Sequence, residues 1–355
     1  MSWVAISDGR RPVVIPEIAP DIVAPLMPSG TLIAEVQFNV ESGARQIVAQ
    51  LDRNVQWRRR FRMSLGETGD LLVEHRQGDT ITNSVIRFPR PDREATLRIT
   101  MSWHAPNRVG LVTVENLDSM ESGQAAFEEP HPWPLDDIAA LVGQTAGCGV
   151  DPSVTLLAFS DKVEPIGLTS GFAAGTVVDT MNGPCRVERL RPGDLVQTSD
   201  HGMQPVRCLA THEVPAFGRF APVDLRAPFF GLEKDLTVAP DHRLLISGVD
   251  AEYLFGSDSV LVEARHLAKM GAYPRRMRPT TIRYFQVLLD AHVCLSVAGA
   301  WGESLFLGDL ADNPARHAIS PLAGIPVKDL PKHTEIASPE LRSYEAMVLV
   351  SALCA

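Results

Sequence analysis

Residues 30 to 117 are divided into short segments of alternating apolar and polar residues, and glycines at 66, 69 and 78 mark turns between or beside them. Each segment has the length of a β-strand and is rich in β-branched and aromatic residues. Many strands at regular spacing, with almost no helical periodicity, predict a β-sandwich or jelly roll. The expected strands are 31–40, 45–51, 57–65, 70–76, 80–88, 95–103 and 108–115.

The segment from residue 128 to residue 167 is predicted to follow this sandwich. Prolines at 130, 132 and 134 exclude a helix there, whereas Leu135 to Leu141 has a short helical pattern. Residues 154–160 have the composition of one more strand, which we expect to close the sandwich. The first domain is therefore predicted to span residues 1–167.

From residue 171 the pattern is again one of strands and turns. Asn182 and Gly183 lie between two strand-like segments, 176–180 and 185–190, which predicts a hairpin. Further strand-like segments are 236–246, 260–267, 282–289 and 292–297, and residues 339–351 have a helical pattern. We expect an all-β chain with a second domain at 168–310 and a C-terminal extension at 311–355 that ends in a short helix.

Composition excludes several classes of protein. A chain of 355 residues with 45% hydrophobic residues can bury the cores of two globular domains. Its net charge of −10 argues against a nucleic-acid partner, and we interpret the short arginine runs at 58–60 and 275–276 as solvated faces. No apolar run approaches the roughly 18 residues of a membrane span, and the first residues do not form a signal peptide.

The cysteines point to no special chemistry. They are odd in number, widely spaced and without a Cys-x-x-Cys pair, so neither a zinc site nor a disulfide framework is predicted. Buried free thiols are expected, and no cofactor or metal. An acidic chain with few cysteines fits the cytoplasm or a secreted bacterial assembly without an N-terminal signal peptide. The five are Cys148, Cys185, Cys208, Cys294 and Cys354.

Four separated motifs occur in the second half of the chain. The first combines Gly-Phe-Ala-Ala-Gly-Thr at 171–176 with residues 187–198, and the others lie at 240–245, 260–267 and 301–304. Together they resemble a Hint (Hedgehog/intein) self-cleaving domain of the bacterial type, over about residues 165 to 310. The resemblance implies a compact β fold in which a side chain attacks the peptide bond before it.

In the family, a cysteine precedes the Phe-x-x-Gly-Thr turn, a Thr-x-x-His or Ser-x-x-His element activates the scissile amide, and a late His and an Asn-Gly segment lie beside the site. By this resemblance, both histidines of the family are present in this chain. The nucleophilic cysteine, the Thr or Ser hydroxyl and the Asn side-chain amide are absent. The matching positions are Gly171, Ala239, His242, His292 and Ala298.

Glycine has no side chain with which to form an ester or thioester. Loss of a nucleophile costs a protease about a millionfold in turnover, and loss of a polarising donor on the order of a hundredfold. We therefore expect a degenerate Hint domain that is not an enzyme in the ordinary sense.

Several alternatives remain open from the sequence. The Ser170 hydroxyl lies one residue before the nucleophile position, and the Cys294 thiol is another candidate nucleophile for slow cleavage. His242 fits both a remnant of the site and a structural histidine. His292 has apolar neighbours, which favours a structural role, and Asp241 is expected to brace the turn after Pro240.

The order of strands in the first half, especially residues 97–106 and the strand after them, resembles a concanavalin A-like (laminin G-type) jelly roll. That resemblance implies carbohydrate binding as an association of the family, and no sugar-binding residue is identified. We expect a structural or binding protein with a protein or glycan partner. The alternatives are slow self-cleavage near Ser170 and Gly171 that releases the N-terminal domain, or carbohydrate binding by that domain.

Overall fold

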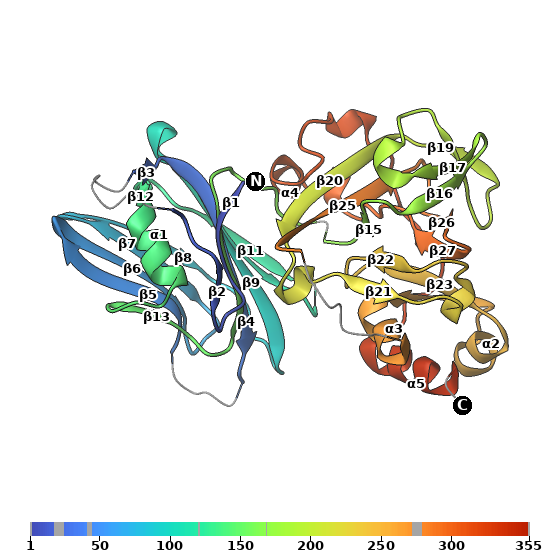
Figure 1. Cartoon of the computed structure of the whole chain (residues 1–355), viewed down its shortest axis with the longest axis horizontal. Helices are drawn as coiled ribbons and strands as arrows, with labels where there is room; N and C mark the ends of the chain where they lie inside the picture. Colours follow the sequence, from blue (N-terminus) through green and yellow to red (C-terminus); the bar gives the residue numbers. More distant parts are fainter. Residues whose placement is uncertain are drawn as a thin grey trace. The chain divides into compact units, whose positions relative to one another are not determined.

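The computed structural model describes residues 2–17, 25–40, 45–119, 121–167, 169–271 and 279–353. The chain forms two compact units, Met1–Glu164 and Pro165–Ala355, each with its own hydrophobic core (Figure 1). The predicted all-β class, with a sandwich first and a short helix near the C-terminus, is confirmed. The domain limits drawn from the sequence stay predictions.

The first unit is a sandwich of two antiparallel sheets. Within its described residues, one sheet has seven strands in the order β11-β10-β9-β4-β14-β1-β2, and the other has five in the order β13-β5-β6-β7-β8. The strands of the first sheet are β1 (Trp3–Ser7), β2 (Pro12–Val14), β4 (Ser29–Phe38), β9 (Ala95–His104), β10 (Val109–Asn116), β11 (Ser122–Ala126) and β14 (Val154–Ser160). Those of the second are β5 (Gln46–Val55), β6 (Trp57–Leu65), β7 (Leu71–Gln77), β8 (Thr80–Ile86) and β13 (Cys148–Val150).

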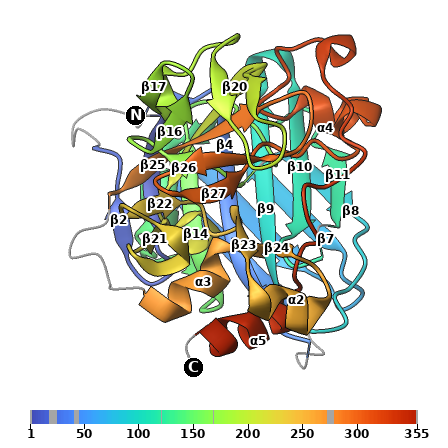
Figure 2. The same ribbon diagram turned by 90° about the vertical axis from the view of Figure 1, so that its right-hand side faces the viewer.

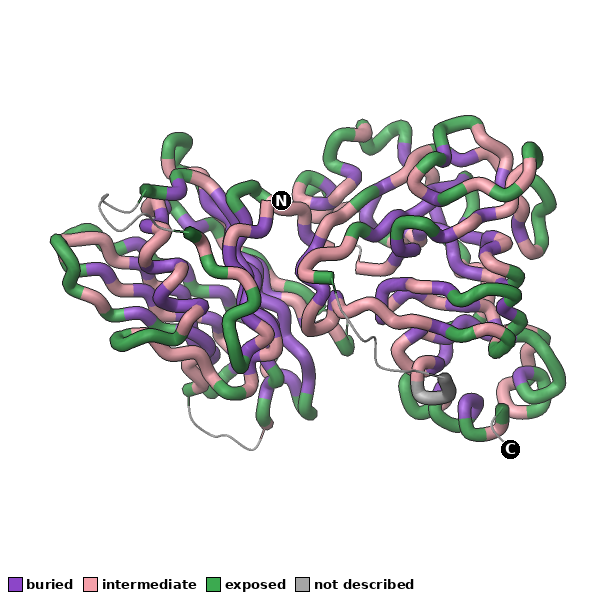
Figure 3. Tube along the Cα trace, in the orientation of Figure 1, coloured by how far each residue is buried: buried purple, intermediate pink, exposed green. Residues whose placement is uncertain are grey.

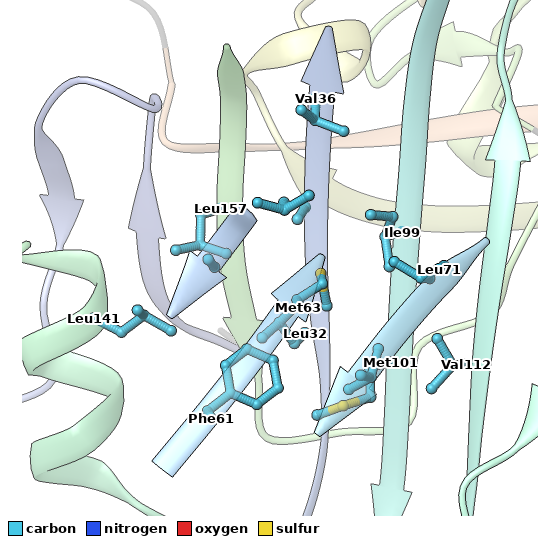
Figure 4. Close-up of a cluster of buried hydrophobic side chains, with 14 of the residues drawn as sticks. Leu32, Val36, Phe61, Met63, Leu71, Ile99, Met101, Val112, Leu141 and Leu157 are labelled. Atoms are coloured by element: carbon cyan, nitrogen blue, oxygen red, sulfur yellow. The ribbon is translucent and has the colours of Figure 1, made fainter. Parts of the chain in front are cut away.

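Alternation along these strands builds the core between the sheets. Leu32 and Val36 of β4 and Phe61 and Met63 of β6 all belong to this core, and the four side chains are completely buried (Figure 4). The short strands β3 (Leu26–Met27) and β12 (Trp133–Pro134) pair with each other, and helix α1 (Leu135–Val142) follows directly. Helix α1 adds Leu141 to the same core, as the sequence pattern at 135–141 indicates.

The arginine run in β6 divides between the two faces of its sheet. Arg58 is half exposed, and its only ion pair among the described residues is a 4.0 Å contact with Asp52. Arg59 is 3% exposed and lies 2.9 Å from Asp136 and 3.2 Å from Asp137, in the first turn of α1. The interpretation of the whole run as a solvated face is therefore wrong for Arg59, because the two-residue period of a strand turns it inward.

Arg59→Met should lower the free energy of unfolding of the first unit by about 1 to 3 kcal/mol, because it removes one of the two guanidinium groups at the buried Asp137 carboxylate and leaves only Arg53, at 2.7 Å. Arg58→Met changes the neighbouring exposed position and should alter stability by less than about 0.5 kcal/mol. Urea unfolding followed by tryptophan fluorescence measures both. Equal midpoints for the two variants would contradict the assignment of Arg59 to the interior.

The second unit also contains two sheets. In its described part, five strands follow the order β20-β25-β15-β22-β21, and a further sheet follows the order β19-β18-β16-β26-β27-β23-β24, with β17 paired to β16. The first sheet contains β15 (Phe172–Ala173), β20 (Cys208–Pro215), β21 (Val223–Leu225), β22 (Leu236–Val238) and β25 (Thr281–Leu288). The second contains β16 (Val177–Thr180), β17 (Gly183–Arg186), β18 (Leu195–Gln197), β19 (Met203–Pro205), β23 (Arg243–Ser247), β24 (Ser259–Glu263), β26 (Cys294–Val297) and β27 (Ala300–Glu303).

The predicted hairpin at Asn182 and Gly183 is present: β16 and β17 pair with Thr180 opposite Gly183. Only the first half of the strand-like segment predicted at 260–267 forms a strand. Strand β24 ends at Glu263, and helix α3 (Ala264–Gly271) begins at the next residue, where helix-forming residues replace the β-branched ones. The other helices are α2 (Val249–Phe255), α4 (Pro314–Ala318) and α5 (Ser343–Leu353), so the terminal helix begins later than predicted.

The C-terminal segment is part of the second unit. The backbone of Leu261 in β24 bonds to both Pro339 and Leu341, and α5 contributes Leu349 and Val350 to the core of this unit. Helices α2, α3 and α5 lie together at one end of the unit in both views (Figure 1, Figure 2). None of the helices in the described residues is long and apolar enough to cross a membrane.

Candidate functional site

The Phe-x-x-Gly-Thr turn begins inside the first sheet of the second unit. The Phe172 side chain is fully buried, and its backbone pairs with Val238 of β22 on one side and Phe285 of β25 on the other. The amide of Ala239 donates to the carbonyl oxygen of Gly171 at 2.9 Å. Residue 171 is thus held between two strands rather than at the end of a free loop.

A side chain at Gly171 would crowd the neighbouring strand β25. Its φ is +140°, and a Cβ built on it would lie 2.9 Å from the carbonyl oxygen of Phe285 and 3.2 Å from side-chain atoms of Tyr284 and Gln286. The nearest of these atoms belongs to the backbone of β25 and cannot rotate away. The structure therefore excludes a side chain at this position unless β25 moves.

Ser170 is held by a residue that the sequence analysis did not single out. The side-chain amide of Gln286 donates to the Ser170 carbonyl oxygen at 2.7 Å and to its hydroxyl oxygen at 3.0 Å. A donor at the carbonyl of the 170–171 bond is the kind of group that stabilises a developing oxyanion. Gln286 is the single amide within the apolar segment 282–289, and that contrast is the signal that could have identified it.

Asp241 braces the chain just before the site. Its carboxylate accepts from the Thr169 hydroxyl at 3.2 Å and from the Arg219 guanidinium at 2.8 Å. A second guanidinium, that of Arg265, lies 3.6 Å away. These contacts fix the turn after Pro240 and connect it to residue 169.

The His242 ring packs against the Phe172 ring, with centroids 4.3 Å apart. The side chain is 2% exposed, and among the described residues neither ring nitrogen has a hydrogen-bond partner. Burial lowers the pKa of His242 to about 4, against the partly opposing effect of Glu303. The imidazole is therefore neutral at pH 7.

Both histidines meet at one carboxylate, Glu303. The Nδ1 atom of His242 lies 3.9 Å from one oxygen of Glu303, and the Nε2 atom of His292 lies 3.5 Å from the other. Sequence analysis placed Glu303 in a matched block but gave it no role. The structure brings His242 and His292 together through it.

Arg243 keeps this buried carboxylate ionised. Its backbone amide and its Nε donate to Glu303 at 2.9 and 2.7 Å, and the same guanidinium binds Glu340. Burial acts to raise the pKa of Glu303, but the Arg243 charge and the His292 contact outweigh it and lower the pKa to about 2.

The second nitrogen of His292 is occupied by the C-terminal segment. The amide of Ala337 donates to His292 Nδ1 at 3.0 Å, which leaves the proton on Nε2, facing Glu303. The ring also packs against Phe306, at 4.9 Å between centroids. Because Nδ1 accepts from Ala337 and Nε2 carries the proton, neutral His292 has no nitrogen lone pair free to accept another proton.

Ala298 lies in the two-residue turn between β26 and β27. Its φ is +51° and that of Gly299 is +91°, the left-handed pair of a type I′ hairpin. Its carbonyl accepts from the amide of Glu233 at 2.8 Å and its amide donates to Val177 at 3.3 Å. In the described part of the chain, these hydrogen bonds join it to the hairpin's surroundings rather than to Ser170 or Gly171.

The Cys294 thiol is completely buried on β26, opposite Glu303 of β27. Burial, together with the Glu303 charge, raises its pKa to about 12. The thiol therefore stays protonated at pH 7, and this cysteine is a very poor nucleophile. The other described cysteines, Cys148, Cys185 and Cys208, are also free but only partly buried, so the expectation of buried thiols is wrong for these three. Cys354 lies outside the described residues.

Comparison with known proteins supports the Hint resemblance. A sequence model of the Hint domain family matches residues 170–309. No curated protein matches the chain significantly.

Solved structures share only low similarity with this chain. The Ruminococcus gnavus IT-sialidase CBM40 bound to α2,6-sialyllactose is 11% identical, covers 46% of this chain and 88% of its own, and has a TM-score of 0.28. The LG1-3 region of the laminin α2 chain is 10% identical over 85% of this chain and 55% of its own, with a TM-score of 0.26. A leech intramolecular trans-sialidase is 12% identical over 53% of this chain and 29% of its own, also at 0.26. Similarities this low carry no functional argument.

Gly171→Ala should lower the free energy of unfolding of the second unit by about 2 to 4 kcal/mol, because it adds both the strain of positive φ and the overlap with β25. Gly175→Ala is the matched control. Gly175 also has positive φ, +91°, but nothing lies within 4 Å of its added carbon, so only the strain of about 1 to 2 kcal/mol remains. Calorimetric unfolding measures both, and equal losses would contradict the crowding at residue 171.

Acid should destabilise the second unit through His242. The folded pKa of about 4 lies below the unfolded value near 6.5, so the unfolded chain takes up the proton first as the pH falls. The stabilisation is complete above pH 6.5 and decreases by about 2 to 3 kcal/mol on going to pH 4.5. His242→Gln should unfold with a correspondingly smaller change between pH 7 and pH 4.5. An unchanged pH dependence in the variant would show that His242 is not the responsible group.

Proposed function

We propose that this is a binding or structural protein in which the Hint-type unit holds the chain intact instead of cleaving it. The observation that carries the proposal is the crowded backbone at residue 171, near the start of the region, residues 170–309, that matches the Hint family. Its φ of +140° and the neighbouring Phe285 carbonyl oppose a side chain there, so the chain lacks both the nucleophile and the space for one.

The surroundings of the two alternative nucleophiles, Cys294 and Ser170, also support this proposal. The Cys294 thiol stays protonated and buried. The Ser170 hydroxyl already accepts from Gln286, and it would need a base to remove its proton before attacking the carbonyl of Thr169. The His292 Nδ1 already accepts from the Ala337 amide, and the His242 ring lies against Phe172 with Nδ1 toward Glu303. Within the described residues, the Ser170 hydroxyl is hydrogen-bonded to Gln286 and to neither histidine.

What remains of the site has a structural use. Glu303, Arg243 and the two histidines join β23, β27 and the segment around Ala337 into one buried polar cluster. In this proposal the former reaction centre acts as a rigid connection within the second unit. The first unit is then the part that recognises a protein or glycan partner, a role for which its sandwich architecture is suited but which no residue yet defines.

The intact mass of the full chain tests this proposal. We expect a single species at 38.7 kDa after prolonged incubation at neutral pH, with or without hydroxylamine or dithiothreitol, because no ester or thioester forms for them to release. Fragments of roughly 18 and 20 kDa, with a new N-terminus at Ser170 or Gly171, would contradict it.

Two variants identify the route if such fragments form. Loss of the fragments in Ser170→Ala would assign slow cleavage to the hydroxyl, and their loss in Cys294→Ala would assign it to the thiol. Either result replaces the scaffold proposal with the autoproteolytic alternative. Intact wild-type protein under all conditions supports the scaffold.

A further inference from the structure

Helix α5 is apolar on two opposite sides. Ala346, Leu349 and Val350 face the core of the second unit. On the other side Tyr344, Met347 and Val348 are 57%, 44% and 50% exposed. A helix that is apolar all round is typical of a fully buried position, yet one of its faces is open to solvent.

Helix α2, which contacts α5, also has exposed apolar residues. Val249 and Tyr253 are four residues apart, on one side of the helix, and are 81% and 86% exposed. Helices α2 and α5 contact each other and lie side by side in both views of the ribbon (Figure 1, Figure 2). Exposed segments run along both helices in the burial view (Figure 3). We call the surface formed by these two helices the α2/α5 face.

The α2/α5 face carries several large apolar or aromatic side chains. Val249, Tyr253, Tyr344, Met347 and Val348 are each at least 44% exposed, whereas exposed apolar residues of a monomer are usually scattered singly. Aromatic residues and Met are also enriched at the centres of protein interfaces.

Charges around the face favour a protein over a lipid surface. Asp250 and Glu252 are exposed on α2, and the one acidic residue of α5, Glu345, is engaged by the amide of Arg342. Helices that lie on membranes carry Lys and Arg on their polar side, and an anionic membrane would repel these carboxylates. A second protein surface is the better match.

The charges also fit a second copy of the same chain. Arg342 is exposed at the start of α5 and makes no ion pair with any described residue, and the same holds for Asp250 and Glu252. In a two-fold arrangement, equivalent apolar side chains meet at the centre, while Arg342 of one copy can reach the carboxylates of the other. A second copy of the chain can therefore cover the α2/α5 face without a partner of another kind.

We propose that the α2/α5 face is the interface of a homodimer in which two copies of this chain pack through α2 and α5 about a two-fold axis. The apolar residues of the two helices supply the buried centre of this interface. Arg342, Asp250 and Glu252 form its charged rim.

The mass of the full chain in solution tests the dimer. Light scattering after gel filtration, at micromolar concentration, should give twice 38.7 kDa for the wild type. Tyr253→Glu combined with Val348→Glu should give a monomer, because each change would bury a charge at the centre of the interface and raise the dissociation constant about 100-fold or more. Both positions are exposed, so circular dichroism of the variant should match the wild type.

Ile81→Glu combined with Val85→Glu is the matched control. These apolar residues are 50% and 56% exposed on β8 of the first unit, and the variant should remain a dimer. A wild-type monomer overturns the proposal. Binding of that monomer to vesicles of phosphatidylcholine and phosphatidylglycerol would assign the face to a lipid surface, and no binding would leave it to a different protein. A dimer that persists in the Tyr253/Val348 variant would place the interface elsewhere.

Discussion

The second unit depends on the close approach of the backbone at Gly171 to strand β25. Phe172 fills the space between β22 and β25, and the hydrogen bond from Ala239 to the Gly171 carbonyl aligns the chain for this insertion. A β-carbon at residue 171 would push against the carbonyl of Phe285. The packing that positions the segment before Phe172 is therefore the same packing that opposes a side chain at residue 171.

A buried carboxylate organises the other half of the site. Glu303 is nearly inaccessible to solvent, and an isolated charge at such a depth would be very costly. Arg243 compensates it, and Glu340 in turn binds the other side of Arg243. Because Glu340 and Ala337 belong to the C-terminal segment, that segment is tied to the polar cluster as well as to the core. Its residues complete the second unit instead of trailing from it.

Sequence alone predicted the elements whose side-chain pattern is local. The strands from β4 to β10, helix α1 and the hairpin of β16 and β17 follow directly from alternation, prolines and the Asn-Gly signal. Strands β1, β2 and β13 have no such pattern of sufficient length, and the helix-forming residues after Glu263 were merged with the strand before them. In the candidate site, the sequence predicted only the residues that belong to the matched motifs. The contacts of Gln286 with Ser170 and of Glu303 with His292 join residues that are separated in sequence, and the residue pattern does not reveal such contacts. The inward direction of Arg59, in contrast, follows from the alternation along β6.

The position of β14 has a consequence for the order of assembly during synthesis. This strand lies between β1 and β4, so the first and fourth strands of the unit have no shared partner until residues 154–160 have left the ribosome. In nascent chains that lack residues 154–160, no strand joins β1 to β4 in this sheet. The first unit thus closes as one late event, and its long-range pairing makes that event slow compared with the formation of the local hairpins β5 to β8.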